Sequence, residues 1–501
     1  MTSTPRMQQV HLGLGLSDYL LTERTATTKS TLCKLEHTAY EAILLEQCPA
    51  SVWPGHSYTY GCPRPMLIDQ EHDKQLVEFH EALIIAITDI VRRWLSDKDA
   101  NFPGRMPLEP EEEGLLQWLD EQVSLGTLAP YSPLQMGSWR PDFLVEDTDG
   151  GHENFRLSEI NARFCFNGFM HGYYGQTALE KMGMTRAGLI GAADGEQFFE
   201  GLLDLFDHKL PLHLLKGDEK GIDITMFIHA VRKRLGFSPR LITPADLRLF
   251  SDPQQPGRTK LGCLADQPNA TGPTFTTAQG EIVEEIHRVG LELHQRELAA
   301  LDPAILQQVS LRCFNDMRTI LLVHDKRMLG IIKQELALLV SRQVLSPAQA
   351  VALDKGIADT YLAGSPDLHE LMQTSLLPSL LDQKNDFLLK PVRGGKGAGI
   401  VFCEDITRAE WLVALQQLQN PSLVHGSSMV VQRCVKQTLY SLILRQSDNQ
   451  QRYPIVGTYH TVHGKYLGLG TWRSSSERIC AVSSGGAWFC SVMKPTAIRA
   501  C

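Results

Sequence analysis

A glycine-rich segment between two predicted strands constrains the fold of this chain more than any other feature. Residues 387–402 read Phe-Leu-Leu-Lys-Pro-Val-Arg-Gly-Gly-Lys-Gly-Ala-Gly-Ile-Val-Phe. The apolar residues predict one strand that ends at Lys390 and a second over Gly399–Phe402. The glycines between them let the backbone approach a ligand and point successive N–H groups at one anion. Because Lys390 can place its ammonium on a phosphate oxygen, the segment indicates a phosphate-binding turn. A hairpin with solvated lysines is the alternative.

Two common nucleotide-binding motifs do not match this segment. A P-loop requires Ser or Thr after its lysine, whereas Lys396 is followed by Gly397. The glycine loop of protein kinases needs a third glycine where Ile400 stands, and the chain has no His-Arg-Asp tripeptide. The phosphate-binding turn is therefore of another kind.

A second group of residues offers the hard oxygen ligands that Mg²⁺ prefers. Strands are predicted over Asp142–Glu146 and Phe155–Ile160. Asp142 lies early in the first strand, and Glu159 and Asn161 differ by two positions, so that their side chains point to one face. Two carboxylates and one carboxamide can form a Mg²⁺ site that substrate phosphates complete. An ordinary polar sheet edge is the alternative.

Two further cations are candidates for phosphate contacts. Lys326 precedes a predicted helix over Gly330–Val340, and Arg473 ends a pair of predicted strands. A lysine at a helix start can face a phosphate, and an arginine can hold a phosphoryl group through two parallel hydrogen bonds. Taken alone, Lys326 fits a solvated helix end and Arg473 fits a surface position.

Length, charge and cysteine content set the class of protein. At 501 residues the chain predicts two or three packed units. Its 43% hydrophobic and 21% charged residues are typical of a globular protein, and its net charge of −9 argues against a nucleic-acid or anionic-membrane surface. The eleven scattered cysteines form no Cys-x-x-Cys pair, and no secretory signal is recognisable, so we expect reduced thiols in a cytoplasmic protein.

The pattern along the chain predicts an α/β (α+β) protein with a helical N-terminal region. The apolar stretch Leu76–Leu95 carries several charges and predicts an amphipathic core helix. A β-α-β order around the helix Ile224–Leu235, which Gly236 ends, predicts a small open α/β unit. Helices are expected over 281–354, and strands from Asp386 onward. The predicted regions are 1–125, 126–205, 206–320 and 321–501.

Together these motifs resemble the circularly permuted ATP-grasp enzymes, such as the glutathionylspermidine synthetase domain. Conventional ATP-grasp chains run from a Lys-Pro-x-x-Gly-Gly-x-Gly turn to an acidic Glu-x-Asn, whereas here Glu159–Asn161 precedes Lys390–Gly399. The resemblance covers roughly residues 125–500 and implies a permuted ATP-grasp fold, in which the 206–320 unit is the pre-ATP-grasp part. Within this family the chain most resembles stand-alone fungal ATP-grasp proteins of secondary-metabolite clusters, such as those of the fumisoquin pathway.

The resemblance implies a role for each matching residue. It makes Asp142, Glu159 and Asn161 the Mg²⁺ ligands. It makes Arg140 and Arg473 the arginines that hold the acyl phosphate and the transferring phosphate. The implied ATP-binding residues are Lys326, Lys390, Arg393, Gly394, Gly395, Lys396, Gly397 and Gln432, the last in the strand of the adenine pocket.

The implied activity is ATP-dependent ligation of a carboxylate to an amine or thiol through an acyl phosphate, with ATP and Mg²⁺ as cofactors and an amino acid or similar small carboxylate as substrate. A small-molecule phosphotransferase and a non-catalytic nucleotide-binding protein are the alternatives. Residues 162–168 depart from the family turn, so the substrate need not be glutathione. We expect the aromatic loop 163–175 and residues 1–125 to shape its pocket. No nucleic-acid or membrane partner is expected, and Cys165 fits a buried small side chain better than a catalytic thiolate.

Overall fold

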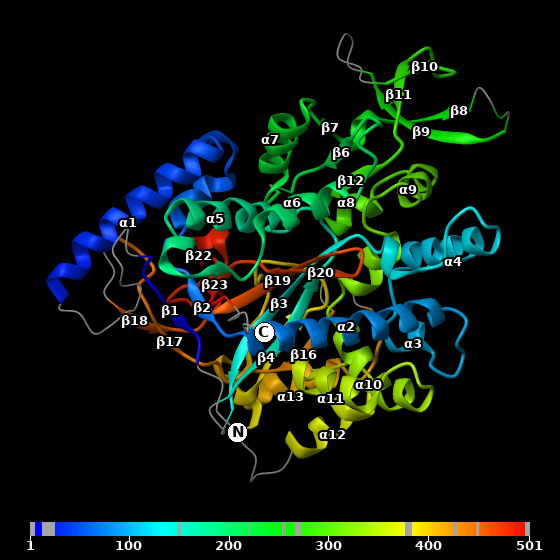
Figure 1. Ribbon diagram of the computed structural model, residues 1–501. Helices are drawn as coiled ribbons and strands as arrows, with labels where there is room; N and C mark the ends of the chain where they lie inside the picture. Colours follow the sequence, from blue (N-terminus) through cyan, green and yellow to red (C-terminus); the bar gives the residue numbers. More distant parts are fainter. Residues whose placement is uncertain are drawn as a thin grey trace, which may run out of the picture.

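The computed structural model combines helices with several sheets, which confirms the predicted α/β class (Figure 1). The structure describes residues 6–12, 26–148, 152–219, 221–252, 255, 257–265, 272–375, 383–423, 428–446 and 450–495.

A six-stranded antiparallel sheet lies at the centre of the molecule (Figure 1). Its strands are β3 (Ser138–Asp147), β4 (Glu153–Asn161), β19 (Val456–Val462), β20 (Lys465–Leu469), β21 (Trp472–Ser474) and β22 (Ala487–Phe489). The order is β22-β21-β19-β3-β4, and β20 also pairs with β19. Because Thr458 of β19 lies opposite Asp142 of β3, segments from two distant parts of the chain share one sheet.

The two faces of this sheet have different roles. Trp139, Phe143 and Val145 of β3 are at most 1% exposed and belong to the hydrophobic core. Their alternating neighbours, which include Arg140 and Asp142, line a cavity. The period-two alternation of a strand therefore separates core from candidate site.

A second antiparallel sheet, of order β13-β16-β14-β15, carries the glycine-rich segment. Its strands are β13 (Thr360–Tyr361), β14 (Phe387–Pro391), β15 (Val401–Phe402) and β16 (Met429–Arg433). The predicted strand that ends at Lys390 is confirmed in β14. A bridge joins Leu157 of β4 to Ile357, which lies three residues before β13. The helices of this part are α10 (Arg327–Ser341), α11 (Pro347–Gly356), α12 (Pro366–Ser375) and α13 (Arg408–Gln417).

The predicted β-α-β unit is confirmed as a parallel sheet, β12-β6-β7, of β6 (His213–Lys216), β7 (Arg240–Ile242) and β12 (Val289–Glu292). Helix α7 (Ile224–Leu235) connects β6 to β7 and ends at Gly236, whose φ of 78° suits glycine.

The prediction of helices over 281–354 was wrong at its start. Residues 282–292 form β11 (Ile282–Glu285) and β12 instead. The antiparallel sheet β10-β11-β9-β8, at the upper right of Figure 1, was not predicted; its other strands are β8 (Leu247–Ser251), β9 (Thr259–Leu264) and β10 (Thr274–Thr276). Pairing of β11 with β9 and of β12 with β6 overrides the helical tendency of the glutamates here.

The N-terminal region is mostly helical, as predicted. Its helices are α1 (Ala26–Gln47), α2 (Gln70–Arg93), α3 (Phe102–Arg105) and α4 (Pro110–Ser124). The remaining α-helices of the described chain lie further on and are α5 (Phe169–Lys181), α6 (Gly195–Leu203), α8 (Gln295–Ala299) and α9 (Pro303–Ser310). The remaining strands are β1 (Gln8–Gln9), β2 (Met66–Ile68), β5 (Ile190–Gly191) and β23 (Ser491–Met493) in one sheet and β17 (Tyr440–Leu442) with β18 (Gln451–Tyr453) in another. Helix α2 confirms the predicted core helix, since most of its apolar side chains are buried.

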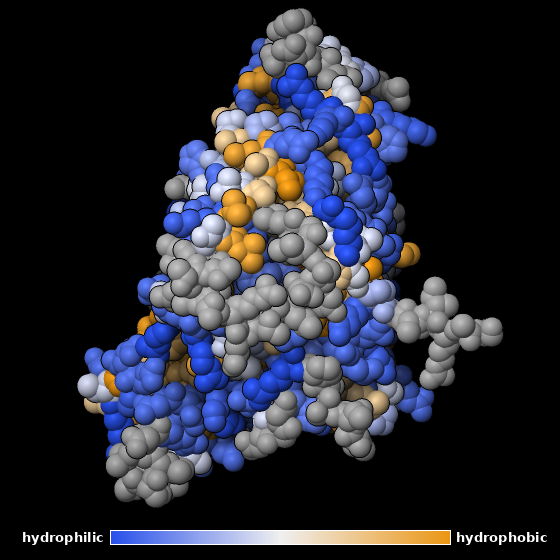
Figure 2. All heavy atoms as spheres, turned by 60° about the vertical axis from the view of Figure 1, so that its left-hand side comes forward, coloured by the Kyte–Doolittle hydropathy of each residue, from blue (hydrophilic) through white to orange (hydrophobic). Residues whose placement is uncertain are grey.

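Within the described part of the chain, no helix has both the length and the apolar character to cross a membrane. On the face shown in Figure 2 hydrophilic residues predominate, and hydrophobic residues gather in small groups.

The central sheet should be sensitive to added volume at Gly457 of β19. A Cβ atom there would lie 2.4 Å from the Phe143 ring and 2.6 Å from the Trp472 ring. We expect Gly457→Ala to destabilise the protein by about 1–3 kcal/mol through overpacking, measured as a lower urea midpoint. Gly114→Ala is the control: that position in α4 is exposed with nothing within 4 Å, so alanine should stabilise by about 0.5–1 kcal/mol. Equal midpoints for the two variants would contradict this packing.

Candidate active site

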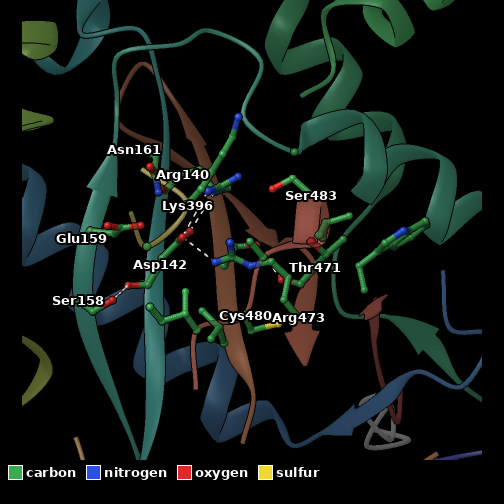
Figure 3. Close-up of a pocket in the computed structure, with 18 of the residues that line it drawn as sticks. Arg140, Asp142, Ser158, Glu159, Asn161, Lys396, Thr471, Arg473, Cys480 and Ser483 are labelled. Carbon is green, nitrogen blue, oxygen red and sulfur yellow. Dashed lines mark hydrogen bonds and ion pairs between the residues drawn. The ribbon is translucent and has the colours of Figure 1, made fainter. Parts of the chain in front are cut away.

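A cavity of about 480 Å³ is lined by residues of both the central sheet and the β13–β16 sheet. Asp142, Glu159 and Asn161 face it from β3 and β4, Lys390 from β14, and Arg473 from β21. Figure 3 shows Arg140 and Arg473 converging on Asp142, with Glu159 on the neighbouring strand. The structure therefore brings together residues that the sequence separates by more than two hundred positions.

The register of β3 and β4 sets the positions of the acidic residues. Asp142 lies opposite Glu159, and Arg140 opposite Asn161. The next pair is Phe143 with Leu157, so Ser158 is an extra residue in β4 and forms a β-bulge. The bulge leaves the Ser158 carbonyl free to accept hydrogen bonds from outside the ladder.

Two arginines hold the Asp142 carboxylate. Arg140 Nε lies 3.0 Å from Oδ1, and Arg473 Nη2 lies 2.6 Å from Oδ2. Asp142 is 3% exposed. Burial opposes the charge of Arg473, but Asp142 and Glu159 outweigh it and raise the pKa of the guanidinium. Both arginines are thus fixed as cations on the wall of the cavity.

Two lysines approach the same place, Lys390 from strand β14 and Lys326 from the start of helix α10. Lys326 is the N-cap of α10, and its Nζ lies 2.8 Å from the Gly394 carbonyl and 3.5 Å from Glu159 Oε2. Lys390 Nζ donates a long hydrogen bond of 3.5 Å to the Ser158 carbonyl. Burial, together with nearby Lys326, lowers the pKa of Lys390 to about 8, although Glu159 opposes the shift. Lys390 is therefore a buried ammonium with weak solvation and room for an anion.

Glu159 is the negative centre of this arrangement. Burial would raise its pKa, but Lys326, Lys390, Arg473 and Arg140 lower it to about 2. With Asp142, two carboxylates thus face four cations. The excess of positive charge in a cavity suits a multivalent anion such as a polyphosphate.

The oxygen donors on β3 and β4 fit a hard divalent cation. Glu159 is partly exposed to the cavity, and Asn161 Nδ2 donates to the Arg140 carbonyl at 3.3 Å, which leaves its amide oxygen available. Asp142 accepts from two arginines, but a carboxylate has about four lone-pair positions and can serve a metal as well. Carboxylate and carboxamide oxygens are what Mg²⁺ prefers. These three residues could hold Mg²⁺.

The glycine-rich turn has an unusual backbone. Gly394, Lys396, Gly397 and Gly399 all have positive φ, which is costly for Lys396 as a non-glycine residue. Gly397 and Lys396 line the cavity, and Lys396 Nζ lies 3.0 Å from Glu219 Oε1. Gly394 contributes through its carbonyl, which accepts from Lys326. The neighbouring Gly395 has open space where a Cβ would be.

Of the predicted nucleotide-binding residues, those that do not line the cavity are Lys326, Arg393, Gly394, Gly395 and Gln432. The side chains of Arg393 and Gln432 have structural partners instead. Arg393 Nη1 lies 2.7 Å from Glu112, and its Nε lies 3.2 Å from the buried Asp325. Gln432 is 2% exposed, and its amide donates to the Ser158 carbonyl and to Thr360. In this arrangement both side chains hold the β13–β16 sheet against its neighbours.

Sequence reasoning missed an apolar part of the cavity. Leu388, Ile400, Phe402, Val435 and Val456 line it from β14, β15, β19 and the segments next to β15 and β16. Apolar residues on strands look the same in a sequence whether they face a core or a ligand, so their pattern carried no signal.

The expectation that the aromatic loop 163–175 shapes the pocket was wrong for its central aromatic residues. Phe166 and Phe169 are fully buried and Tyr174 is 3% exposed, all in the hydrophobic core. Gly168 and His171 line the cavity instead. Cys165 is fully buried, and burial raises the pKa of its thiol well above the ordinary value, so it is a small core side chain.

Known proteins resemble this chain in sequence and in fold. The family model of the AnkG N-terminal domain matches residues 79–322. The chain is 36% identical over 426 residues to the ATP-grasp enzyme ankG of Aspergillus thermomutatus, with 84% of this chain and 86% of the relative covered. The solved apoform of a glutathione synthetase-like effector (GSS30) from Globodera pallida matches with a TM-score of 0.53 at 12% identity, over 92% of this chain and 97% of that one. At that identity the likeness shows the fold.

The electrostatics of the cavity predict an unusual titration of Lys390. We expect its amine to become reactive with a midpoint near pH 8, because burial disfavours the ammonium. Competitive labelling with acetic anhydride from pH 6 to 11, read by mass spectrometry, measures this, with exposed Lys74 as the reference on the same sample. Glu159→Gln should move the midpoint lower, because it removes the carboxylate that favours the charged form. Identical labelling curves for wild type and Glu159→Gln would contradict this charge coupling.

Proposed function

This chain belongs to the family of the ATP-grasp enzyme ankG, and from that premise we propose that it is an ATP-dependent ligase that activates a small carboxylate as an acyl phosphate and joins it to an amine or a thiol. The observation that supports the proposal most is the cavity lined by Arg140, Arg473 and Lys390 together with the carboxylates Asp142 and Glu159, the latter also paired with Lys326 at 3.5 Å. An amino acid or a similar small acid is the proposed substrate. We further propose that the protein acts in fungal secondary metabolism and is located in the cytoplasm.

The nucleotide has a place for each of its parts. The apolar residues around Leu388, Ile400 and Phe402 offer contacts for a flat base. Lys390 and Lys326 lie where strand β14 passes into the glycine-rich turn, so their ammonium groups suit the phosphates. The apolar and charged parts of one cavity thus match the two chemical halves of ATP.

Mg²⁺, held by Glu159, Asn161 and Asp142, would neutralise phosphate charge in this site. The chain's own residues do the rest by position. Arg473 and Arg140 can hold the transferring phosphoryl group and the substrate carboxylate next to each other. A carboxylate oxygen then attacks the γ-phosphorus as the bond to ADP breaks, and phosphoryl transfer of this kind requires orientation and charge neutralisation more than covalent help from the protein.

A phosphotransferase is the second candidate, because the same cations could serve a phosphate acceptor other than a carboxylate. Hydroxylamine separates the two reactions, since it captures an acyl phosphate as a hydroxamate but does not give this product with a phosphorylated alcohol. We expect purified protein with ATP and Mg²⁺ to form a hydroxamate, with equimolar phosphate release, for at least one amino acid in a screen. ATP binding without hydroxamate for any acid tested would favour the alternatives.

Arg473 provides a sharp test of the phosphate-holding role. Arg473→Lys should lower kcat and kcat/KM together by about 10²–10³-fold, because an ammonium cannot reproduce the planar two-point contact of a guanidinium. ATP affinity, which rests mainly on the lysines, should change much less. Both are measured by hydroxamate kinetics and by calorimetric ATP titration.

Arg234→Lys is the matched control for this exchange. Arg234 forms an exposed ion pair with Glu196 and Glu200, and its substitution should leave kcat within about twofold. If Arg473→Lys behaved like Arg234→Lys, Arg473 would have no part in holding the phosphate.

A further inference from the structure

Three polar side chains form a hydrogen-bonded chain beside the cavity. Ser57 Oγ lies 2.9 Å from His171 Nε2, and His171 Nδ1 lies 2.8 Å from Asp223 Oδ1. Ser57 belongs to the 3₁₀ segment Pro54–Tyr60, His171 to the first turn of α5, and Asp223 is the N-cap of α7. Their exposed fractions are 3%, 4% and 0%. Three distant segments thus meet in one chain of hydrogen bonds.

The surroundings fix the direction of these hydrogen bonds. An ionised Asp223 can only accept, so His171 Nδ1 donates to it and Nε2 is left to accept from the Ser57 hydroxyl. Asp223 Oδ2 also accepts from the backbone N–H of Met170, at 2.8 Å. The rings of Trp53 and Trp488 stand edge-on to His171 at 5.5 and 5.3 Å between centroids. The imidazole is therefore held in one orientation, as a general base requires.

The hydrogen-bonded chain borders the part of the cavity where the carboxylate would sit. Ser57 and His171 both line the cavity. Arg140 Nη1 lies 3.3 Å from the carbonyl of Asn167, two residues before α5, the helix that carries His171. The arginine assigned to the acyl group thus contacts the segment that leads into the helix of His171, and both residues line the same cavity.

Ligation with an amine has a proton requirement that acyl-phosphate formation lacks. An alkylamine has a pKa of roughly 10 and arrives as an ammonium at neutral pH, and it must lose a proton before it can attack. An ammonium and an acyl phosphate give an amide, hydrogen phosphate and one released proton. The C–N bond forms as the C–O bond to phosphate breaks, the departing phosphate carries one proton, and one proton needs an acceptor.

We propose, on the basis of the ligase function above, that Ser57, His171 and Asp223 form a proton relay that deprotonates an incoming alkylamine in the second half-reaction. Ser57 Oγ accepts the proton from the ammonium while its own proton passes to His171 Nε2, and Asp223 stabilises the imidazolium. His171 then releases the proton to solvent. Ser57 does not become acylated, because the acyl phosphate is already an activated species and an ester would only lower its reactivity.

Other titratable groups face the relay but do not replace it. Cys48, Tyr174 and Glu292 lie near Asp223, and His460 lies near His171. Burial raises the pKa of Cys48 to about 11 and the pKa values of Tyr174 and Glu292 above their ordinary values, and it lowers the pKa of His460. Each neighbour is held toward its uncharged form.

The test compares two acceptors with the same acid and the same enzyme. Hydroxylamine is a free base at neutral pH and needs no deprotonation before attack, whereas methylamine is protonated. With Ser57→Ala or His171→Asn we expect the ratio of methylamide to hydroxamate formation at pH 7 to fall by about 10²-fold relative to wild type, as for loss of a general base. The ratio should recover as the pH rises.

Thr59→Ala is the control, because it removes an exposed hydroxyl from the same segment and should leave both rates unchanged. Equal loss with both acceptors would show that Ser57 and His171 only shape the cavity and would overturn the relay. Unchanged methylamide formation would overturn it too, as would an acyl adduct on Ser57 in intact-protein mass spectra. Absence of hydroxamate with the wild type would instead refute the ligase function itself.

Discussion

The pairing of β19 with β3 is the contact on which the candidate site depends. It places Thr458 opposite Asp142, and β21, which follows on the other side of β19, carries Arg473 to within 2.6 Å of that carboxylate. Without this pairing, the strands β3 and β4 and the side chain of Arg473 would not be held in fixed positions relative to each other. The same ladder buries Phe143 against Trp472, so core packing and site geometry rest on one set of backbone hydrogen bonds.

The site keeps one cation, Lys390, in a buried place where nearby carboxylates compensate its charge only in part. Lys390 has a lowered pKa because its burial is only partly offset by Glu159. A buried charge of this kind costs stability, and a polyphosphate would offset the cost on binding. The burial of the Lys390 ammonium and the affinity of the cavity for an anion therefore have one origin, which favours a binding site over a structural ion-pair network.

The sequence predicted what depends on local pattern. Asp142, Glu159 and Lys390 could be assigned to positions in predicted strands, because the period of two in a strand can be recognised from neighbouring residues. The β-bulge at Ser158, the strands over 282–292 and the burial of Phe166 and Phe169 could not, because they are decided by partners distant in the chain. The hydrogen-bonded chain of Ser57, His171 and Asp223 was invisible for the same reason: no spacing along the sequence connects its members. The roles that the family resemblance implies for the site residues, Arg393 and Gln432 included, stay predictions.

The bulge at Ser158 explains how the motif order along the chain can be permuted without loss of the site. By leaving the ladder, the Ser158 carbonyl accepts from both Lys390 and Gln432, at 3.5 and 3.3 Å, and so joins the acidic sheet to the glycine-rich sheet through side chains. Such a junction depends on the strand register within each sheet. It does not require Glu159 and Lys390 to be close together along the chain. The chain can therefore enter the two sheets in either order, provided that β19 and β21 return to β3, and the glycine-rich turn still faces the same carboxylates.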